Sequence, residues 1–443
     1  MQNNSFSKNS LITLLTEILL FIFGLVYLII LTRVLGPAGK GIYSLIILVP
    51  ALMLSFGSLG LESANVYFIG KRKYNIKDII SNSLVMSVFL GVILIFAFFI
   101  LSKFYFFKNF LDSSQISLIY LWLIVLTIPL SLFLSLFRNI IKGAGEITNF
   151  NKTRILESFI GLVSVIVLLL ILKQGIFGAI LAYIIALIAG IIFVIYLVKK
   201  IANFSASINF SLLKDSFIYG GKVYLANTIS FLNYRLDMLL IAIFLAPAEV
   251  AIQVGFYSIA VGMAEKIFII PGALSTVLFP KVSSIENYEA DNLTPKVVRH
   301  TFFIVLVVSF LLLFLANPLI IIAFGKEFLA SVLPFIFLLP GIIAFSVGGV
   351  IAADLSGRGK PQYAIYSSIT GLILNIILNI ILIPRYGIAG AAVASSISYW
   401  ADTFIVLRAF IKISGKSLFE VLIIKKQDFR DYYNLFLKLR EGK

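Results

Sequence analysis

Long apolar runs dominate the chain, and short segments that carry charge, glycine or proline separate them. A hydrocarbon core about 30 Å thick is crossed by roughly 20 mostly apolar helical residues, at about 1.5 Å per residue. The runs are about twice the length of a barrel strand and lack its alternation, so they predict helices. We predict twelve transmembrane helices, at residues 11–31, 43–69, 79–101, 117–141, 154–172, 177–198, 217–245, 254–279, 301–324, 331–354, 362–383 and 387–411.

The composition excludes most enzyme chemistry. The chain has 443 residues, of which 60% are hydrophobic and 13% are charged, whereas about 25% of the residues in soluble domains are charged. It has no cysteine and a single histidine, His300, which excludes disulfides, thiol nucleophiles and Cys/His zinc sites. No GxxxxGK[ST] phosphate-binding loop is present. We therefore expect no catalytic residue, metal or cofactor, and the duplicated architecture described below is typical of a transporter rather than an enzyme.

The net charge of +16 indicates membrane orientation rather than nucleic-acid binding, because cytoplasmic loops of membrane proteins are enriched in lysine and arginine. With loops assigned to alternate sides, most loop cations, Arg154 among them, share the side of Lys71; Lys40 falls on the opposite side. This predicts that both termini are cytoplasmic. The first apolar run contains Glu17 and is too long for a signal peptide, so we expect it to be retained as a span.

Three short motifs occur twice, in the same order and at nearly the same offset. The pairs are 175–179 with 387–391, 143–145 with 357–359, and 35–44 with 245–258. Each copy would contain six spans. Because six is an even number, both copies enter the membrane from the same face, which predicts two six-helix lobes related by a parallel repeat.

The predicted organisation follows from this duplication. The chain is expected to be an all-α polytopic membrane protein with an N-terminal lobe at 1–200, an inter-lobe linker at 201–216, a C-terminal lobe at 217–413 and a tail at 414–443. Aromatic and basic residues recur in the tail at roughly helical spacing. That pattern predicts a basic amphipathic helix on anionic lipid, and a solvated tail is the alternative.

Charged residues within the predicted spans are candidates for a transport pathway, because a charge at the bilayer centre costs at least about 2.5 kcal/mol and usually faces a cavity. Those near the middle of spans are Arg235, Asp237, Glu265, Lys266 and Asp402. Those nearer the cytoplasmic ends include Glu62, Arg138 and Lys222.

Each of these charges also has a structural interpretation. Arg235 and Asp237 would form an ion pair with each other or with a neighbouring helix. Glu265 and Lys266 are adjacent and point in different directions, so separate interhelical pairs are the alternative. Asp402 would form a hydrogen bond to a neighbouring helix, and the residues near span ends would extend to the membrane surface.

Several segments together resemble one family. These are Leu31–Pro37 followed by Gly41–Ser44, Tyr234–Asp237, Pro271–Lys281, Gly359–Pro361, Asn379–Pro384 and Gly387–Ala392. They resemble the polysaccharide transporters, which include the Wzx-type oligosaccharide flippases of the MATE-like exporter superfamily. The resemblance extends over all twelve predicted spans.

The resemblance implies a flippase that moves an oligosaccharide on undecaprenyl diphosphate from the inner to the outer leaflet by alternating access, during cell-surface polysaccharide biosynthesis. The location would be the cell inner membrane of a bacterium or archaeon. Partners would be the lipid-linked oligosaccharide, membrane lipids, and polysaccharide polymerase or assembly proteins, without nucleic acid. Lipid II flippases of the superfamily usually have fourteen spans, so twelve count against a peptidoglycan precursor as cargo.

In that mechanism the charged residues divide into two groups. The substrate-pathway candidates are Arg235, Asp237, Arg138, Lys222, Lys266 and Glu62, of which the cations would contact the diphosphate. The ion-coupling candidates are Asp237, Glu265 and Asp402. An ion-coupled multidrug or small-molecule exporter of the same fold is the main alternative, and a membrane scaffold that transports nothing is another.

Overall fold

The computed structural model describes residues 2–105, 107, 111, 112, 114–202, 208–425, 427 and 428. Nearly all of these residues are helical. In chain order the elements are α1 (Gln2–Gly57), α2 (Leu61–Lys71), α3 (Ile76–Leu101), α5 (Leu118–Val125), α6 (Ile128–Gly143), α7 (Ile147–Val165), η1 (Ile166–Ile171), α8 (Gly175–Ile201), α9 (Phe210–Phe244), α10 (Pro247–Glu265), η2 (Lys266–Phe268), α11 (Ile269–Ser284), α12 (Asn287–Phe324), η3 (Lys326–Ser331), α13 (Val332–Gly357), α14 (Gln362–Ser414) and α15 (Leu418–Leu422).

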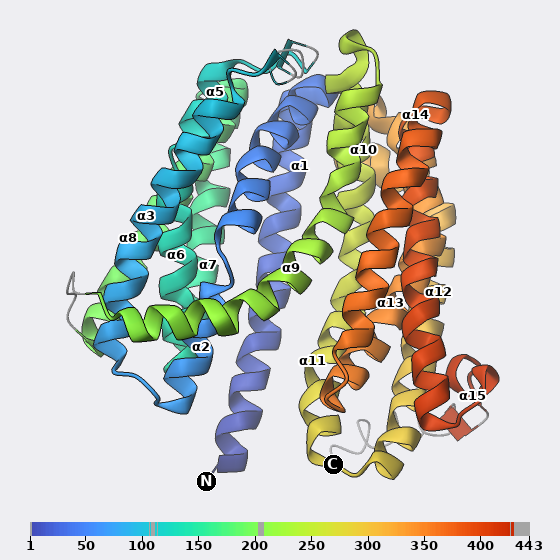
Figure 1. Ribbon diagram of the computed structural model, residues 1–443. Helices are drawn as coiled ribbons and strands as arrows, with labels where there is room; N and C mark the ends of the chain where they lie inside the picture. The colour runs from blue at the N-terminus through green and yellow to red at the C-terminus, as the bar shows by residue number, and fades with distance from the viewer. Residues whose placement is uncertain are drawn as a thin grey trace, which may run out of the picture. The chain divides into compact units, whose positions relative to one another are not determined.

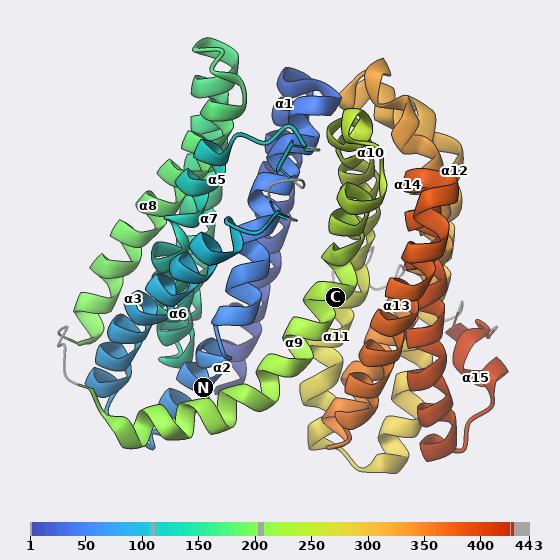
Figure 2. The same ribbon diagram turned by 45° about the horizontal axis from the view of Figure 1, so that its top comes forward.

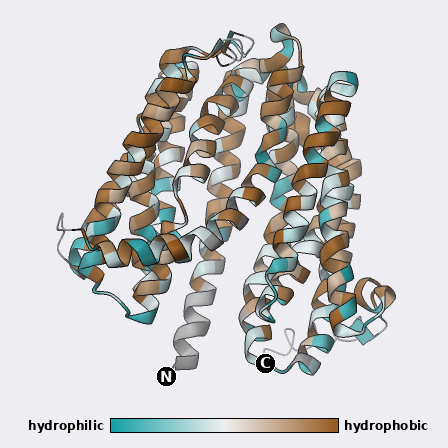
Figure 3. Cartoon of the chain, in the orientation of Figure 1, coloured by the Kyte–Doolittle hydropathy of each residue, from teal (hydrophilic) through white to brown (hydrophobic). Residues whose placement is uncertain are grey.

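Nine helical segments in this part of the chain are long and apolar enough to cross a membrane. They range from 25 to 53 residues, so each exceeds the roughly 20 residues that a bilayer requires. Hydrophobic residues cover most of the length of these helices in Figure 3. The chain is therefore an all-α membrane protein that crosses the bilayer several times.

Two of the long helices turn back on themselves. The backbone leaves the helical region at Gly36 (φ 65°, ψ −179°) in α1 and at Gly387 (φ 57°, ψ −139°) in α14. In Figure 1 the segments before and after each turn run in opposite directions. Glycine has no Cβ and adopts these positive φ values at little cost. The loops that we expected between the first and second spans, and between the last two, are thus reduced to single-residue turns.

Two predicted spans are interrupted. The predicted helix at 43–69 is divided, because α1 ends at Gly57 and α2 begins only at Leu61. Leu59 and Gly60 have φ values of 51° and 73°, which a continuous right-handed helix does not allow. The predicted helix at 117–141 is likewise divided between α5 and α6, and a proline lies in the first turn of α6, where its missing N–H costs nothing.

Other boundaries also differ from the prediction. Helix α9 begins at Phe210 rather than 217, because the Asn209 side chain caps it by accepting a hydrogen bond from the Leu212 N–H at 3.1 Å. Part of the expected linker is therefore helical, and residues 203–207 lie outside the described part. In the tail, α15 begins with a capping box made by Ser417 and Glu420. Residues 429–443 of the predicted amphipathic tail lie outside the described residues.

The N-terminal unit comprises Met1–Phe256 and Ala323–Glu327. Within it α7 packs against α1 and α8, and α6 packs against α2, α3 and α8. Helix α9 lies alongside α2, as Figures 1 and 2 both show. A Cβ added at Gly41 would lie 1.7 Å from the Ala251 carbonyl oxygen, and one at Gly255 would lie 2.0 Å from that of Pro37. Helices α1 and α10 therefore meet backbone to backbone.

The C-terminal unit comprises Tyr257–Ile322 and Phe328–Lys443. Helix α13 packs along α14 and against α11, and buried side chains such as Val298, Ile351 and Phe410 form its core. Inside α14, Asn375 donates hydrogen bonds to the hydroxyls of Ser395 and Ser398, each at 3.3 Å. These bonds join the two antiparallel segments of α14, in the manner of polar contacts between membrane helices.

Candidate functional site

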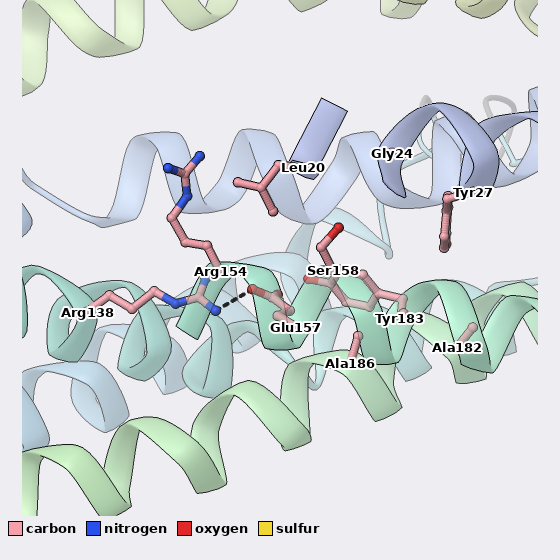
Figure 4. Close-up of a pocket in the computed structure, with 11 residues that line it drawn as sticks. Leu20, Gly24, Tyr27, Arg138, Arg154, Glu157, Ser158, Ala182, Tyr183 and Ala186 are labelled. Atoms are coloured by element: carbon pink, nitrogen blue, oxygen red, sulfur yellow. Dashed lines mark hydrogen bonds and ion pairs between the residues drawn. The ribbon is translucent and has the colours of Figure 1, made fainter. Parts of the chain in front are cut away.

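Four helices of the N-terminal unit, α1, α6, α7 and α8, surround a cavity of about 360 Å³. Its polar lining includes Arg138 of α6, Arg154, Glu157 and Ser158 of α7, and Tyr183 of α8. Arg154 lies three positions before Glu157 and four before Ser158, so it shares a helix face with each of them. In Figure 4, Arg138 points to Glu157, while Arg154 extends from α7 toward α1. The cavity thus brings two guanidinium groups together.

Each arginine is held by a carboxylate that belongs to another helix. Arg138 pairs with Glu157 and donates a hydrogen bond to the Thr153 carbonyl at 3.2 Å. Arg154 binds Glu17 of α1 with both of its terminal nitrogens, at 2.5 and 3.2 Å. Such two-point contacts fix the orientation of a guanidinium. They also make charged side chains compatible with helices that are apolar enough to span a membrane.

The two guanidinium groups retain donors for a ligand. A guanidinium carries five N–H groups, and the hydrogen bonds of Arg138 to Thr153 and Glu157 use only one of its terminal nitrogens. Its Nε is buried and has no hydrogen-bond partner among the residues that the structure describes. An anion that entered the cavity would compete with Glu157 and Glu17 for the guanidinium N–H groups. The arrangement is suited to binding an oxyanion.

A second cavity, of about 310 Å³, lies on the other side of α6 residues Ser131 and Ser135. Glu62 of α2 lines it, together with hydroxyl side chains from α1, α6 and α9. The same two serines also line a third cavity, of about 350 Å³, that contains Arg138 and Arg154. The cavity that contains Glu62 and the cavity that contains both arginines therefore share Ser131 and Ser135 in their linings.

Two of the predicted pathway residues, Arg138 and Glu62, lie in these cavities. Asp237 of α9 is buried, and its Oδ1 accepts a hydrogen bond from the Met238 N–H at 2.8 Å. Arg235 is half-buried on the same helix. The Lys222 side chain lies outside the described residues. Neither Asp237 nor Arg235 lines the cavities just described.

The other candidates belong to the C-terminal unit. Glu265 ends α10 and Lys266 begins η2, so this pair stands at a change in helix type. Asp402 of α14 is buried and shares a hydrogen bond with Ser367. Their roles in a pathway or in ion coupling stay predictions. No group of three or more acidic or histidine residues suited to a metal ion occurs in the described ranges.

Two cations lie where the sequence analysis did not place them. Arg154 was assigned to a cytoplasmic loop, yet it lies within the apolar helix α7 and faces the cavity. The available signal was its spacing, since Arg154, Glu157 and Gly161 share a face of that helix. Lys40, expected in a loop on the opposite side, is buried in α1 and donates a hydrogen bond to the Ser44 hydroxyl at 2.6 Å.

The family follows from the sequence. The profile of the family described as polysaccharide biosynthesis protein matches residues 6–286, more than half of the chain. This chain belongs to that family. The resemblance to polysaccharide transporters is therefore confirmed.

Relatives of this family member come from archaea and bacteria. An uncharacterized membrane protein of Methanocaldococcus jannaschii is 27% identical over 92% of this chain and 99% of its own length. The "Probable low-salt glycan biosynthesis flippase Agl15" of Haloferax volcanii is 29% identical, over 40% of this chain and 38% of its own. A Shigella flexneri relative that carries the name of an O-antigen transporter is 24% identical over 85% of this chain and 90% of its own.

Solved structures show the fold of this family member. The lipid II flippase MurJ, in an inward closed conformation, matches with a TM-score of 0.72 and 18% identity, over 92% of this chain and 89% of that chain. An inward-facing multidrug resistance MATE transporter of the MOP superfamily matches with a TM-score of 0.71 and 16% identity, over 89% and 95%. The family member thus has the fold shared by these flippases and exporters.

Proposed function

We propose that this protein is a flippase that moves an oligosaccharide, linked to undecaprenyl diphosphate, from the inner to the outer leaflet for cell-surface polysaccharide assembly. The observation that carries the proposal is the pair of arginines in one cavity among apolar helices. A diphosphate and its sugars do not cross hydrocarbon unaided, whereas guanidinium groups bind phosphate through two parallel hydrogen bonds. Family membership and the names of two relatives support the polysaccharide cargo.

Arg138 and Arg154 would bind the diphosphate by exchanging their carboxylate partners for phosphate oxygens. Glu157 and Glu17 hold the two guanidinium groups in place, so these groups are oriented before the substrate arrives. The prenyl chain would remain in lipid. No covalent step is involved, because binding and release on opposite sides suffice in alternating access. The protein is accordingly a transporter and not an enzyme.

We also infer twelve spans in two lobes related by a parallel repeat. The turns at Gly36 and Gly387 divide α1 and α14 into two crossings each, and α9 adds one to the nine segments. The matched motifs share backbone conformation: Gly145 and Gly359 have φ values of 81° and 75°, and Gly175 matches Gly387 at 55° and 57°. Duplicated segments would retain such glycines.

The contact between α1 and α10 also supports the repeat. Gly41 faces Ala251, and Gly255 faces Pro37. The motif copies that contain Gly41 and Gly255 thus contact one another reciprocally, as related segments do across a local two-fold axis. With an even number of spans and the loop charges of the sequence, both termini lie on the cytoplasmic side of the inner membrane. Polymerase and assembly proteins would act on the product.

Ion coupling would use Asp237, Glu265 or Asp402, whose carboxylates are the candidates within helices. A cation exporter of the same fold is the alternative, supported by the likeness to the MATE transporter and by buried acids such as Asp402. Such a transporter would carry a cationic dye. The presence of two arginines in the cavity favours an anionic cargo instead.

The test is transfer of labelled undecaprenyl-diphosphate oligosaccharide between the leaflets of liposomes that contain the purified protein. Loss of a charged hydrogen bond costs about 1.5–3 kcal/mol, so we expect Arg138→Gln and Arg154→Gln each to slow transfer about 10- to 100-fold. Arg138→Lys keeps the charge without the planar fork and should be intermediate. Arg385→Gln, at an exposed site, is the matched control.

Transport of a cationic dye without lipid transfer would establish the exporter instead. Lipid transfer that is equal in all four variants would refute the role of the arginine cavity. Thermal unfolding of each variant separates loss of transport from loss of the folded protein.

A further inference from the structure

We propose that the Glu62 cavity is a sugar subsite that takes a neutral or amino sugar, the one attached directly to the diphosphate, and rejects a uronic acid. This inference rests on the proposed function. It names the part of the cargo that the N-terminal unit selects. The cavity of about 310 Å³ lies at the lower end of the range for small-molecule sites, which suits one sugar ring rather than a chain.

The lining of this cavity offers hydrogen-bond acceptors. Tyr224 donates its hydroxyl hydrogen to the Phe56 carbonyl at 2.8 Å, and Thr228 donates to the Ser55 carbonyl at 3.1 Å. Each hydroxyl has one hydrogen and two lone pairs. Since those hydrogens are engaged with backbone, the oxygens of Tyr224 and Thr228 are left to accept.

Glu62 makes the acceptor character stronger. Its carboxylate receives a hydrogen bond from the Ser135 hydroxyl at 3.2 Å and another from Ser58. An ionised carboxylate accepts about four hydrogen bonds, so these two leave capacity for a ligand. A sugar presents several hydroxyl donors, and an amino sugar adds a cationic one. Such donors match the lining, whereas a second carboxylate does not.

The position of the cavity along α6 assigns the sugar. Ser131, Ser135 and Arg138 lie at positions i, i+4 and i+7, so they follow one face of that helix. The serines line the Glu62 cavity, and they also line the cavity that contains Arg138 and Arg154. If the diphosphate occupies the arginines, the sugar bonded to it reaches the serines and Glu62 first.

The charge of Glu62 supplies the selectivity. Two carboxylates brought together in a site of low dielectric repel one another strongly. Glucose and glucuronic acid differ only in a carboxylate in place of the C6 hydroxymethyl group. A uronic acid at the first position should therefore be transported at least about tenfold more slowly than glucose, and glucosamine at least as fast as glucose.

The experiment uses three labelled lipids on the same prenyl diphosphate, whose first sugar is glucose, glucosamine or glucuronic acid, with an identical labelled second sugar. Transfer is measured in liposomes, and binding of each lipid is measured in detergent. We expect Glu62→Gln to bring the glucuronic lipid to within about threefold of the glucose lipid. Tyr224→Phe removes an acceptor oxygen and should slow the glucose and glucosamine lipids without helping the glucuronic one. Glu289→Gln, at an exposed position, should retain the wild-type pattern.

Equal rates and affinities for the glucose and glucuronic lipids in the wild-type protein would overturn the subsite. So would a Glu62→Gln protein that discriminates as the wild type does. If the wild-type protein transfers none of the lipids, the proposed function fails, and the binding measurement alone then decides whether Glu62 selects the sugar. A protein that binds none of the three refutes both proposals.

Discussion

The buried ion pair between Arg299 and Asp428 gives a sharp test of what holds the C-terminal segment in place. Arg299 of α12 binds Asp428 with Nε at 2.8 Å and Nη2 at 3.0 Å, and its Nη1 donates to the Glu420 carbonyl at 2.7 Å. The Lys425 N–H donates to the same carboxylate at 2.8 Å. Asp428→Asn keeps the size of the side chain and removes the charge.

The magnitude follows from the pKa of Asp428. The Arg299 guanidinium lowers that pKa from 3.8 to about 2, which corresponds to about 2 kcal/mol of stabilisation. The side chains are only 9% and 3% exposed, so solvent screens the pair weakly. Loss of one partner also leaves a buried charge unpaired, which costs about 3–5 kcal/mol when no relaxation occurs. We expect Asp428→Asn to lower the free energy of unfolding by about 2–4 kcal/mol.

The pH dependence has a definite sign. A carboxyl whose pKa is lower in the folded protein stabilises it above the unfolded pKa, and this stabilisation is lost as the pH falls toward the folded pKa. The difference between wild type and Asp428→Asn should therefore shrink as the pH falls between about pH 4 and pH 2.

The assay is thermal unfolding in detergent over this pH range, with Asp112→Asn at an exposed position as the control. A double-mutant cycle with Arg299→Gln isolates the pairwise energy. Additive effects of the two substitutions, or a difference between wild type and Asp428→Asn that does not decrease at low pH, would refute the assignment.

Two further substitutions test the packing. Gly255→Ala places a Cβ 2.0 Å from a backbone oxygen of α1 and should destabilise the protein by at least about 1–3 kcal/mol in thermal unfolding. The control is Gly272→Ala, whose Cβ meets nothing within 4 Å and which should be neutral or stabilising by up to about 1 kcal/mol. Equal effects of the two substitutions would contradict the close contact. Arg358→Lys removes the guanidinium that binds Asp291 at 2.6 Å and Asp354 at 2.7 Å, and it should lower the free energy of unfolding by about 3 kcal/mol in the same assay. An unchanged unfolding temperature would argue against this role of Arg358.

Apolar patterning predicted the helices well and their interruptions poorly. Span length depends on bilayer thickness, so runs of about 20 apolar residues indicate crossings directly. The break after Gly57 falls at Gly57–Gly60, whose two glycines and serine the prediction included in a continuous span. Its cause is the backbone at Leu59 and Gly60. The single-residue turns at Gly36 and Gly387 were hidden for the opposite reason, because a charged or proline-containing stretch suggested a longer loop.

The candidate site was predicted only in part. A charge inside a span is visible in the sequence, which is how Arg138 and Glu62 were found. Arg154 lies at the end of a predicted span. A cation at such a position gives the same sequence pattern whether it marks membrane orientation or faces a cavity. The tertiary contact with Glu17 distinguishes them, whereas the spacing of Arg154 with Glu157 and Gly161 is the one indication in the sequence.

That contact also has a consequence for how the protein is made. Glu17 and Arg154 are 137 residues apart, and a ribosome adds about 5–20 residues per second. The first helix therefore exists for roughly 7–27 s before its counter-charge has been synthesised. During that interval the carboxylate has no Arg154 to pair with. The cavity can close only once α8 has been made, because its lining extends from Leu20 of α1 to Ala186 of α8.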